Sequence, residues 1–385
     1  MKYVLSGVET NNKGAEIMLY AILQEIERRD PDAIVYMTYL SQGVGYVKTN
    51  VDLRIKPLGR LINFLRNAKI SNHSLLGILG RLGFGRFFID VYSVGKIDYF
   101  LDASGFCVSD KWNTADYEVK NWTRLLSTSK KDGAKIIFLP QGFGPIEQEN
   151  NKKLLKAFND YGNLIIAREK TSYDYIKNTG IADMNKVKMF TDFTSLVHCD
   201  VPSGYDHLRN AVCIIPNERM IDMGTISHDR YIELLKQIAN VAKDKGSKVY
   251  LLNHEGEGDE RLALACKESM GDDIEVVTKL NGLDVKGLIS TAKLVVTSRF
   301  HGVASSLNSC VPCLATSWSH KYSELFKDYG LDNCVLPLDD NEQALLKVSE
   351  FLDEKKNDEI RKILVEKLPK IQQETRNMWK EVWSV

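Results

Sequence analysis

The sequence predicts an α/β protein built from two Rossmann-like domains. Short apolar runs rich in β-branched residues alternate with helix-length amphipathic stretches along almost the whole chain. Continuously apolar strands separated by helices are typical of parallel sheets that are covered on both faces. A length of 385 residues also exceeds what one hydrophobic core usually supports, which favours two domains.

The predicted strands of the first half are Tyr3–Val8, Ile34–Tyr39, Tyr99–Ala103, Ile136–Pro140, Leu164–Ala167 and Val187–Phe190. Between them, apolar residues at helical spacing predict helices at Glu16–Arg28 and Leu154–Asp160. In the second half the predicted strands are Val212–Ile215, Val249–Asn253, Ile274–Val277, Leu294–Thr297, Cys313–Thr316 and Val335–Leu338. Helices are expected at Tyr231–Asp244, Glu260–Met270, Val285–Thr291 and Ser323–Tyr329.

The alternation lapses around Asp200–Asn210, where Pro, Gly, His and charged residues gather. A domain boundary is expected there, which gives an N-terminal domain at 1–205 and a C-terminal domain at 206–385. If the two domains face each other across a cleft, the carboxyl ends of their strands, and therefore the ligands, lie in that cleft.

Composition narrows the class of protein. Lys plus Arg and Asp plus Glu both number 51, so the chain as a whole is not a polyanion binder. No signal-peptide pattern and no membrane-length apolar run is present, and the seven scattered cysteines suit a reducing compartment. A cytoplasmic location is therefore expected. Cys310 and Cys313 follow a predicted helix and precede a strand, the reverse of a redox motif, so they are expected to pack as small apolar residues.

The strongest candidates for catalytic residues follow the predicted strand Leu294–Thr297. Arg299, Phe300 and His301 lie between that strand and a predicted helix at Gly302–Ser309. Helix N-termini favour anions, an arginine adds a bidentate donor for phosphate or carboxylate, and a histidine can move protons near neutral pH. The pattern predicts a catalytic anion site. Helix capping and structural hydrogen bonds are the alternative interpretation.

The stretch SRFHGVASSLNSCVPCLATSWSHKYSELFKDYGL, which contains these residues, resembles the C-terminal segment of the polysaccharide pyruvyl transferase family. VETNNKGAEIML resembles that family's Asn-x-Gly loop, FLPQGFGP its Gln-Gly-x-Gly-Pro turn, and IIAREKTSYDYIKNTGI its Arg-Glu/Asp…Ser segment. Ala15 stands where many members carry Asp, so only Asn12 and Glu16 are carried over from the first loop.

The resemblance implies a glycosyltransferase-B-like fold and transfer of a pyruvyl group from phosphoenolpyruvate to a sugar, with closure of a cyclic ketal. It implies that Arg299, Phe300 and Arg168 bind the donor, and that His301 acts as acid or base. No metal and no cofactor are implied, because phosphoenolpyruvate is a co-substrate. The implied acceptor is a saccharide of a surface polysaccharide or a polyprenyl-diphosphate-linked intermediate.

Other polar residues at strand ends are possible substrate contacts. His254 and Glu255 follow the strand Val249–Asn253, although a surface loop would also suit them. His320 and Lys321 follow Trp318, whose ring suits either sugar stacking or the core.

Three further candidates have structural alternatives. Asn12 and Glu16 either contact a ligand or only help to begin the first helix. Arg168 ends a strand and either points toward the cleft or forms a surface ion pair with Glu169 or Asp174.

A basic amphipathic segment is predicted at 54–96. Its charges are Arg54, Lys56, Arg60, Arg66, Lys69, Arg81, Arg86 and Lys96, against Asp90 alone. Such a segment suits contact with an anionic membrane surface, which would place the protein at the inner face of the membrane. A solvated helical excursion is the alternative. Nucleic-acid binding is not expected, because no aromatic-basic module accompanies the charge.

Two rival functions remain open from the sequence. A nucleotide-sugar-dependent glycosyltransferase would share the two-domain architecture and the site at the strand ends. A non-catalytic saccharide-binding or scaffold protein would share the fold but need no acid–base residue.

Overall fold

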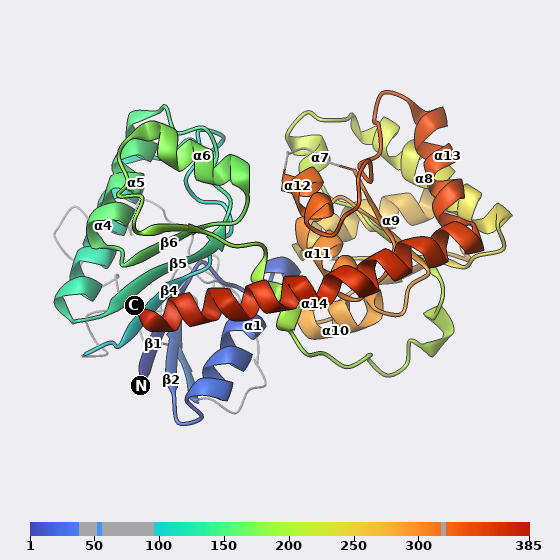
Figure 1. Ribbon diagram of the computed structural model, residues 1–385. Coiled ribbons are helices and arrows are strands. Elements are labelled where there is room, and N and C mark those ends of the chain that lie inside the picture. The colour runs from blue at the N-terminus through green and yellow to red at the C-terminus, as the bar shows by residue number, and fades with distance from the viewer. Residues whose placement is uncertain (38–51, 56–95, 317–320) are drawn as a thin grey trace, which may run out of the picture. The chain divides into compact units, whose positions relative to one another are not determined.

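The computed structural model describes residues 1–37, 52–55, 96–316 and 321–385 (Figure 1). The predicted basic segment 54–96 lies almost entirely outside the described residues, as do Trp318 and His320. No helix in the described ranges is long and apolar enough to cross a membrane.

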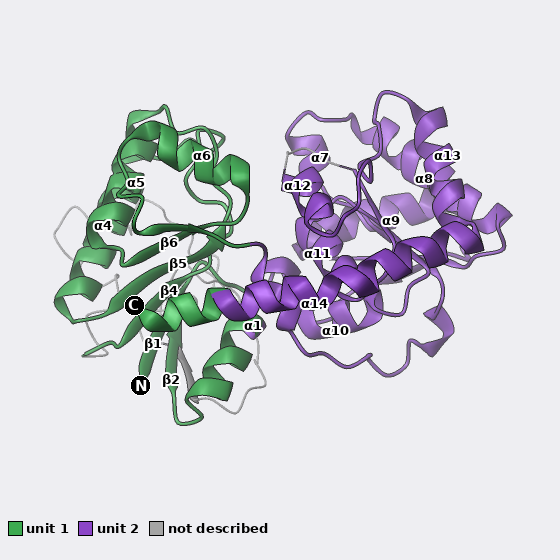
Figure 2. Ribbon diagram, in the orientation of Figure 1, with its two compact units in different colours: residues 1–10, 21–190, 378–385 green, residues 11–20, 191–377 purple. Residues whose placement is uncertain are grey.

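The chain divides into two compact units (Figure 2). Unit 1 comprises residues 1–10, 21–190 and 378–385, and unit 2 comprises residues 11–20 and 191–377. The main break therefore falls before residue 191, earlier than the boundary expected after residue 205. The first and last long helices each contribute residues to both units, which no local lapse in the hydrophobic pattern could indicate.

Unit 1 contains, in the described residues, a seven-stranded parallel sheet of order β3-β2-β1-β4-β5-β6-β7. Its strands are β1 (Lys2–Ser6), β2 (Ile34–Met37), β3 (Asp52–Ile55), β4 (Tyr99–Asp102), β5 (Lys135–Gln141), β6 (Leu164–Ala167) and β7 (Val187–Met189). The helices are α1 (Lys13–Arg29, of which residues 21–29 belong to unit 1), α4 (Asp116–Lys131), α5 (Glu149–Tyr161) and α6 (Lys170–Thr179).

Aromatic side chains anchor the elements of unit 1. The rings of Phe138 on β5 and Phe158 on α5 stack with centroids 3.8 Å apart, which fixes that helix on the sheet. The C-terminal helix α14 (Glu354–Ser384) ends in this unit, where Trp383 packs edge-on against Tyr3 and Tyr99. The Trp383 indole also donates to Glu25, 2.9 Å away.

Unit 2 contains, where the chain is described, a five-stranded parallel sheet of order β10-β9-β8-β11-β12. The strands are β8 (Val212–Ile215), β9 (Val249–Leu252), β10 (Glu275–Val277), β11 (Leu294–Thr297) and β12 (Cys313–Ala315). The predicted strand Val335–Leu338 was wrong, because only one parallel bridge joins Val335 to Ala315. Pro337 has no N–H to extend the ladder.

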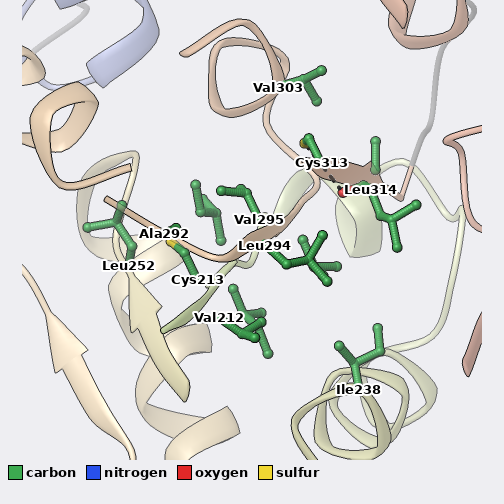
Figure 3. Packing of buried hydrophobic residues seen from close by; sticks show 14 of the residues in the cluster. Val212, Cys213, Ile238, Leu252, Ala292, Leu294, Val295, Val303, Cys313 and Leu314 are labelled. Carbon is green, nitrogen blue, oxygen red and sulfur yellow. Dashed lines mark hydrogen bonds between the residues drawn. The ribbon is translucent and has the colours of Figure 1, made fainter. Parts of the chain in front are cut away.

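The remaining elements of unit 2 are mostly helices. They are the 3-10 turns η3 (Phe193–Leu196) and η4 (Asp206–Leu208), and α7 (Arg219–Asp222), α8 (His228–Asp244), α9 (Gly256–Met270), α10 (Gly282–Ile289), α11 (Phe300–Asn308), α12 (Lys321–Asp328) and α13 (Asn341–Leu352). The first turns of α1 and most of α14 also belong here. Figure 3 shows the core, where Val212, Leu252, Val295 and Leu314 from adjacent strands pack together.

Both sheets reverse their strand order at one point. In unit 1 the chain winds outward from β1 in one direction and from β4 in the other, and in unit 2 it does so from β8 and β11. Ligands of open α/β sheets bind at such switch points, beyond the carboxyl ends of the strands. The structure therefore directs attention to the residues that follow β1, β4, β8 and β11.

Candidate active site

The turn after β11 lies at the switch point of unit 2 and is held by buried hydrogen bonds. Asn217 after β8 and Tyr322 on α12 both donate to the Ser298 carbonyl at 2.7 Å. The Ser298 hydroxyl bonds the hydroxyls of Tyr231 and Thr316. This network fixes the backbone from which the next three side chains project.

Arg299 is the N-cap of α11, and Phe300 and His301 are its first two residues. The helix thus begins two residues before the predicted Gly302. A missing Cβ allows this tight start, because a Cβ on Gly302 would lie 2.5 Å from the Thr297 hydroxyl. His301 therefore stands on a helix rather than in a loop, which fixes its backbone.

The Arg299 guanidinium is clamped by two carboxylates. Nε and Nη2 donate to the two oxygens of Asp259 at 2.8 and 2.6 Å, and Nη1 donates to Glu255. The Arg299 side chain is 11% exposed, and burial lowers its pKa to about 10, so it stays charged at neutral pH. One N–H remains on each terminal nitrogen after these bonds. Arg299 therefore orders the site while keeping donors for an anion.

His301 faces a buried carboxylate. Its Nε2 lies 3.4 Å from Oδ2 of Asp192, and both side chains are about nine-tenths buried. Asp192 also accepts the backbone N–H of Thr194 at 3.0 Å. Burial lowers the pKa of the nearby Lys286, and the charge of Asp192 opposes that shift. The separation between His301 and Asp192 is that of an ion pair rather than of a hydrogen bond. A nearby carboxylate of this kind can still orient the imidazole.

The loop before α1 packs directly onto this region within unit 2. The Lys13 N–H donates to the His254 carbonyl at 3.0 Å, and Asn12 forms an antiparallel bridge with Glu255. A Cβ on Gly14 would lie 2.4 Å from Nδ1 of His301. Glycine is thus required at position 14 for the imidazole to lie against the first turn of α1.

Asn12 and Glu16 both form hydrogen bonds at the start of α1. The Asn12 side-chain oxygen accepts the N–H groups of Gly14 and Ala15 at 2.9 and 3.2 Å, as a helix cap does. Glu16 is 4% exposed and accepts from Lys13 Nζ at 2.9 Å. Burial raises the pKa of Glu16, and its bond to Lys13 opposes that shift. Their predicted contact with substrate stays a prediction.

His254 is the most unusual polar side chain of the site. It is 1% exposed, and neither ring nitrogen has a hydrogen-bond partner among the described residues. Burial, reinforced by the charges of Arg299 and His301, lowers the pKa of His254 well below its ordinary value. A neutral imidazole with unmet hydrogen-bonding capacity therefore sits beside the predicted catalytic residue.

Lys321 approaches the same turn from α12. Its Nζ lies 5.4 Å from the centroid of the Phe300 ring and 5.7 Å from that of Tyr322. The predicted residues Asn12, His254, Glu255, Arg299, Phe300, His301 and Lys321 therefore all belong to unit 2. Among the described residues, no group of three or more His, Cys, Asp or Glu is arranged to hold a metal ion.

Arg168 lies in unit 1, after β6. Its Nε is 3.4 Å from Glu169, so the ion pair of the alternative interpretation is present, but both side chains are buried rather than on the surface. Asp174, the other expected partner, bonds Lys170 instead. A Cβ on Gly142 would touch both the Phe106 ring and Arg168 Nη2, at 2.8 and 3.4 Å. Arg168 thus stands beside the turn Gln141–Gly144 at the carboxyl edge of the sheet.

Asp102 ends β4 at the switch point of unit 1. It is fully buried and accepts from the Ser104 hydroxyl at 2.7 Å and from Gln141 Nε2 at 3.1 Å. Burial raises the pKa of Asp102 to about 6, against the opposing effect of those bonds. Sequence reasoning did not single out Asp102, Asp192 or Asp259. The signal available was that Asp102 lies near the end of one predicted strand and Asp192 shortly follows another.

The two units together have the fold of glycosyltransferase-B-type enzymes. UDP-GlcNAc 2-epimerase from Neisseria meningitidis, bound to UDP-GlcNAc, matches all of both chains at 12% identity with a TM-score of 0.58. The UDP-forming α,α-trehalose-phosphate synthase from Burkholderia vietnamiensis matches 99% of this chain and 96% of its own at 10% identity, with a TM-score of 0.57. Identities this low establish the fold alone, and they confirm the predicted fold class.

Residues 12–320 match the sequence profile described as polysaccharide pyruvyl transferase. The chain therefore belongs to the polysaccharide pyruvyl transferase family, as its resemblance predicted. The match extends over parts of both units and includes Arg168, Arg299 and His301.

The close approach of Gly14 to His301 predicts a coupled pair of substitutions. Gly14→Ala should destabilise the protein by about 1–3 kcal/mol because the added methyl group meets the imidazole. In a His301→Ala background the same change should stabilise, by up to about 1 kcal/mol, because alanine favours helix. Urea unfolding of the four proteins measures the cycle, with Ala15→Gly as control in the same turn. Stabilisation by Gly14→Ala in the wild-type background would contradict the packing.

The raised pKa of Asp102 predicts a pH-dependent stability. The folded state holds this proton more tightly than the unfolded chain, so the stability from Asp102 is full at low pH and is lost as pH rises through about 6. Relative to wild type, Asp102→Asn should therefore gain about 3 kcal/mol at most between about pH 4 and 7. Urea unfolding across that range measures the difference. The exposed Asp160→Asn is the control, and a difference independent of pH would refute the prediction.

Proposed function

We propose that the protein transfers a pyruvyl group from phosphoenolpyruvate to two hydroxyls of a saccharide, forming a cyclic ketal. The site observation that carries the proposal is the His301–Asp192 pair at the start of α11, next to Arg299. Family membership supports transfer to a saccharide, and the cationic side chains suit an anionic donor. The acceptor would belong to a surface polysaccharide or its lipid-linked precursor, with the reaction on the cytoplasmic side of the membrane.

The chemistry requires one proton to enter at carbon and two to leave hydroxyls. The donor's methylene carbon takes a proton and becomes a methyl group, and the first sugar hydroxyl adds to the adjacent carbon as it loses its proton. The C–O bond to phosphate then breaks. The second hydroxyl adds to the same carbon, and its proton leaves with the phosphate or the solvent. One phosphate is released for each ketal formed.

Residues of unit 2 are suited to different steps of this reaction. His301, oriented by Asp192, supplies or removes the proton at the reacting centre. Arg299 stabilises the negative charge of the donor with the N–H groups that Asp259 and Glu255 leave unused. His254 remains neutral, so it can hydrogen-bond to an uncharged substrate group.

Direct turnover tests the proposal. The purified protein, incubated with phosphoenolpyruvate and a panel of free and lipid-linked saccharides, should give products heavier by one pyruvate less one water in mass spectrometry. Phosphoenolpyruvate at 100 times its Kd should also stabilise the protein by about 2.7 kcal/mol in thermal unfolding. Stabilisation by UDP with no pyruvyl product would instead favour a nucleotide-sugar glycosyltransferase, because the Neisseria epimerase with this fold was solved with UDP-GlcNAc.

The His301–Asp192 pair predicts a selective effect on turnover. His301→Ala should abolish activity. Asp192→Asn should lower kcat by about 10–100-fold, since the orienting carboxylate supplies only part of the about 10²–10⁴-fold that a general acid or base contributes. Its KM for phosphoenolpyruvate should stay near the wild-type value, because Asp192 acts through His301. Asp328→Asn, which alters the exposed bond to the neighbouring Thr191, is the control and should retain full turnover. Wild-type kcat in Asp192→Asn would refute the role of this carboxylate.

A further inference from the structure

A pocket of about 460 Å³ opens beside the carboxyl edge of the unit 1 sheet, separate from the residues used in the proposed chemistry. It is lined by aromatic and polar side chains from the segment after β4 and from α4 and α5. These are Phe106, Cys107, Lys111, Trp112, Asn113, Thr114, Glu118, Trp122 and Leu154. The volume lies within the range of small-molecule sites.

The aromatic walls are fixed at defined angles. Phe106 and Trp112 meet nearly at right angles, with centroids 5.9 Å apart, and the Trp112 indole donates to the Phe106 carbonyl at 2.8 Å. Trp122 is anchored by edge contact with Phe158 in the core. Because the indole N–H of Trp112 is already bonded inside the protein, its partly buried ring offers the pocket mainly an apolar surface.

Hydrogen bonds within the protein hold the backbone around this pocket in place without a ligand. Asp110 accepts from the N–H of Glu147 at 2.6 Å, from that of Gln148 at 3.2 Å and from the Asn151 amide at 2.8 Å. The Thr114 hydroxyl bonds Asn151 at 2.8 Å. A pocket ordered in this way loses little conformational entropy when it binds.

The charge of the pocket suits a neutral ligand. Lys111 and Glu118 contribute one charge of each sign. The nearby N-terminus of α4 is already compensated, because Asp116 and Glu118 occupy its first turn and Glu118 accepts the Ala115 N–H at 2.7 Å. A phosphate group would find no excess positive charge. A polyhydroxyl ring, with apolar faces and polar edges, matches aromatic walls and a mixed polar rim.

The pocket is also connected to the predicted donor arginine. Phe106 is both a wall of the pocket and a neighbour of Gly142, next to which Arg168 Nη2 also lies. The thiol of Cys107, another lining residue, is 3.4 Å from Gln141, which bonds Asp102. All of these residues belong to unit 1. A ring held against Phe106 would therefore lie near Arg168.

We propose that this pocket binds a pyranose ring of the acceptor saccharide by stacking on Trp112 and Phe106. The inference rests on the proposed function for the identity of the acceptor, but binding itself needs no donor. A single methyl glycoside is expected to bind with a Kd of about 1 mM, given the ligand efficiency of molecules larger than fragments.

Binding is tested first, without phosphoenolpyruvate. The full chain is titrated with methyl glycosides of glucose, galactose, mannose and N-acetylmannosamine, followed by tryptophan fluorescence and saturation-transfer NMR. At least one glycoside should bind the wild type, and Trp112→Leu should weaken it at least about tenfold. Trp112→Phe should retain part of the binding. The control is Tyr117→Leu, which removes an aromatic ring that is 65% exposed and outside the pocket.

A rim variant guards against misfolding of Trp112→Leu. The pair Lys111→Ala and Asn113→Ala alters only exposed side chains and should also weaken glycoside binding. Melting curves of each variant show whether it is folded. Unchanged glycoside affinity in folded Trp112→Leu, or binding of uridine or adenosine in place of every glycoside, would overturn the proposal, as would a wild type that binds none of them.

Turnover separates this proposal from the proposed function. With phosphoenolpyruvate and a saccharide substrate, Trp112→Leu should raise the acceptor KM at least about tenfold and leave the donor KM within about twofold. If the wild type binds glycosides through Trp112 but transfers no pyruvyl group, the proposed function fails and the pocket stands. If transfer occurs with an unchanged acceptor KM in Trp112→Leu, the pocket assignment fails and the function stands.

Discussion

The clamp of Arg299 by Asp259 and Glu255 is the constraint on which the unit 2 site depends. It ties the turn after β11 to the start of α9, and the buried carboxylate of Asp259 also accepts the Glu218 N–H at 3.0 Å after β8. Three strand ends are thereby joined through Asp259, whose pKa is raised by burial to about 8. Removing one partner of a buried pair typically costs about 3–5 kcal/mol, because the other charge is left without compensation. The same contacts weaken the attraction of Arg299 for an anionic donor. In return, they hold its guanidinium in a fixed position.

The rigid position of Arg299 explains why nearby buried polar groups can lack hydrogen-bond partners. A buried group without a hydrogen bond costs about 1–3 kcal/mol, and His254 has two such nitrogens among the described contacts. The surrounding backbone must be rigid to hold it there. The Ser298 network, the antiparallel bridge of Asn12 with Glu255 and the cap on α1 supply that rigidity. The neutral His254 ring, held rigidly beside cationic side chains, is therefore preorganised to hydrogen-bond to a substrate.

The sequence was sufficient for the fold class because the strands are continuously apolar. Leu294–Thr297 and Val212–Ile215 were located to the residue, and the turn after β11 was placed correctly at the strand end. The pairing of Asp192 and Asp259 with that turn was not predictable, because these contacts are distant in sequence. The two units were expected, but the chain crosses between them at places that the sequence pattern does not mark. Helices α1 and α14 are locally continuous, and only tertiary packing assigns their halves to different units.

Glycine accounts physically for two of the segments by which the family resemblance was recognised. In the first loop, Gly14 lets the start of α1 approach His301 where a methyl group would collide with the ring. In the Gln-Gly-x-Gly turn, Gly142 makes room for the Phe106 ring, and a Cβ on Gly144 would meet the Ser109 hydroxyl. Each segment brings backbone against a candidate functional side chain more closely than any other residue permits. Glycine lowers local stability at these positions. It allows the backbone to pack closely against the side chains of the site, which keeps those side chains in place.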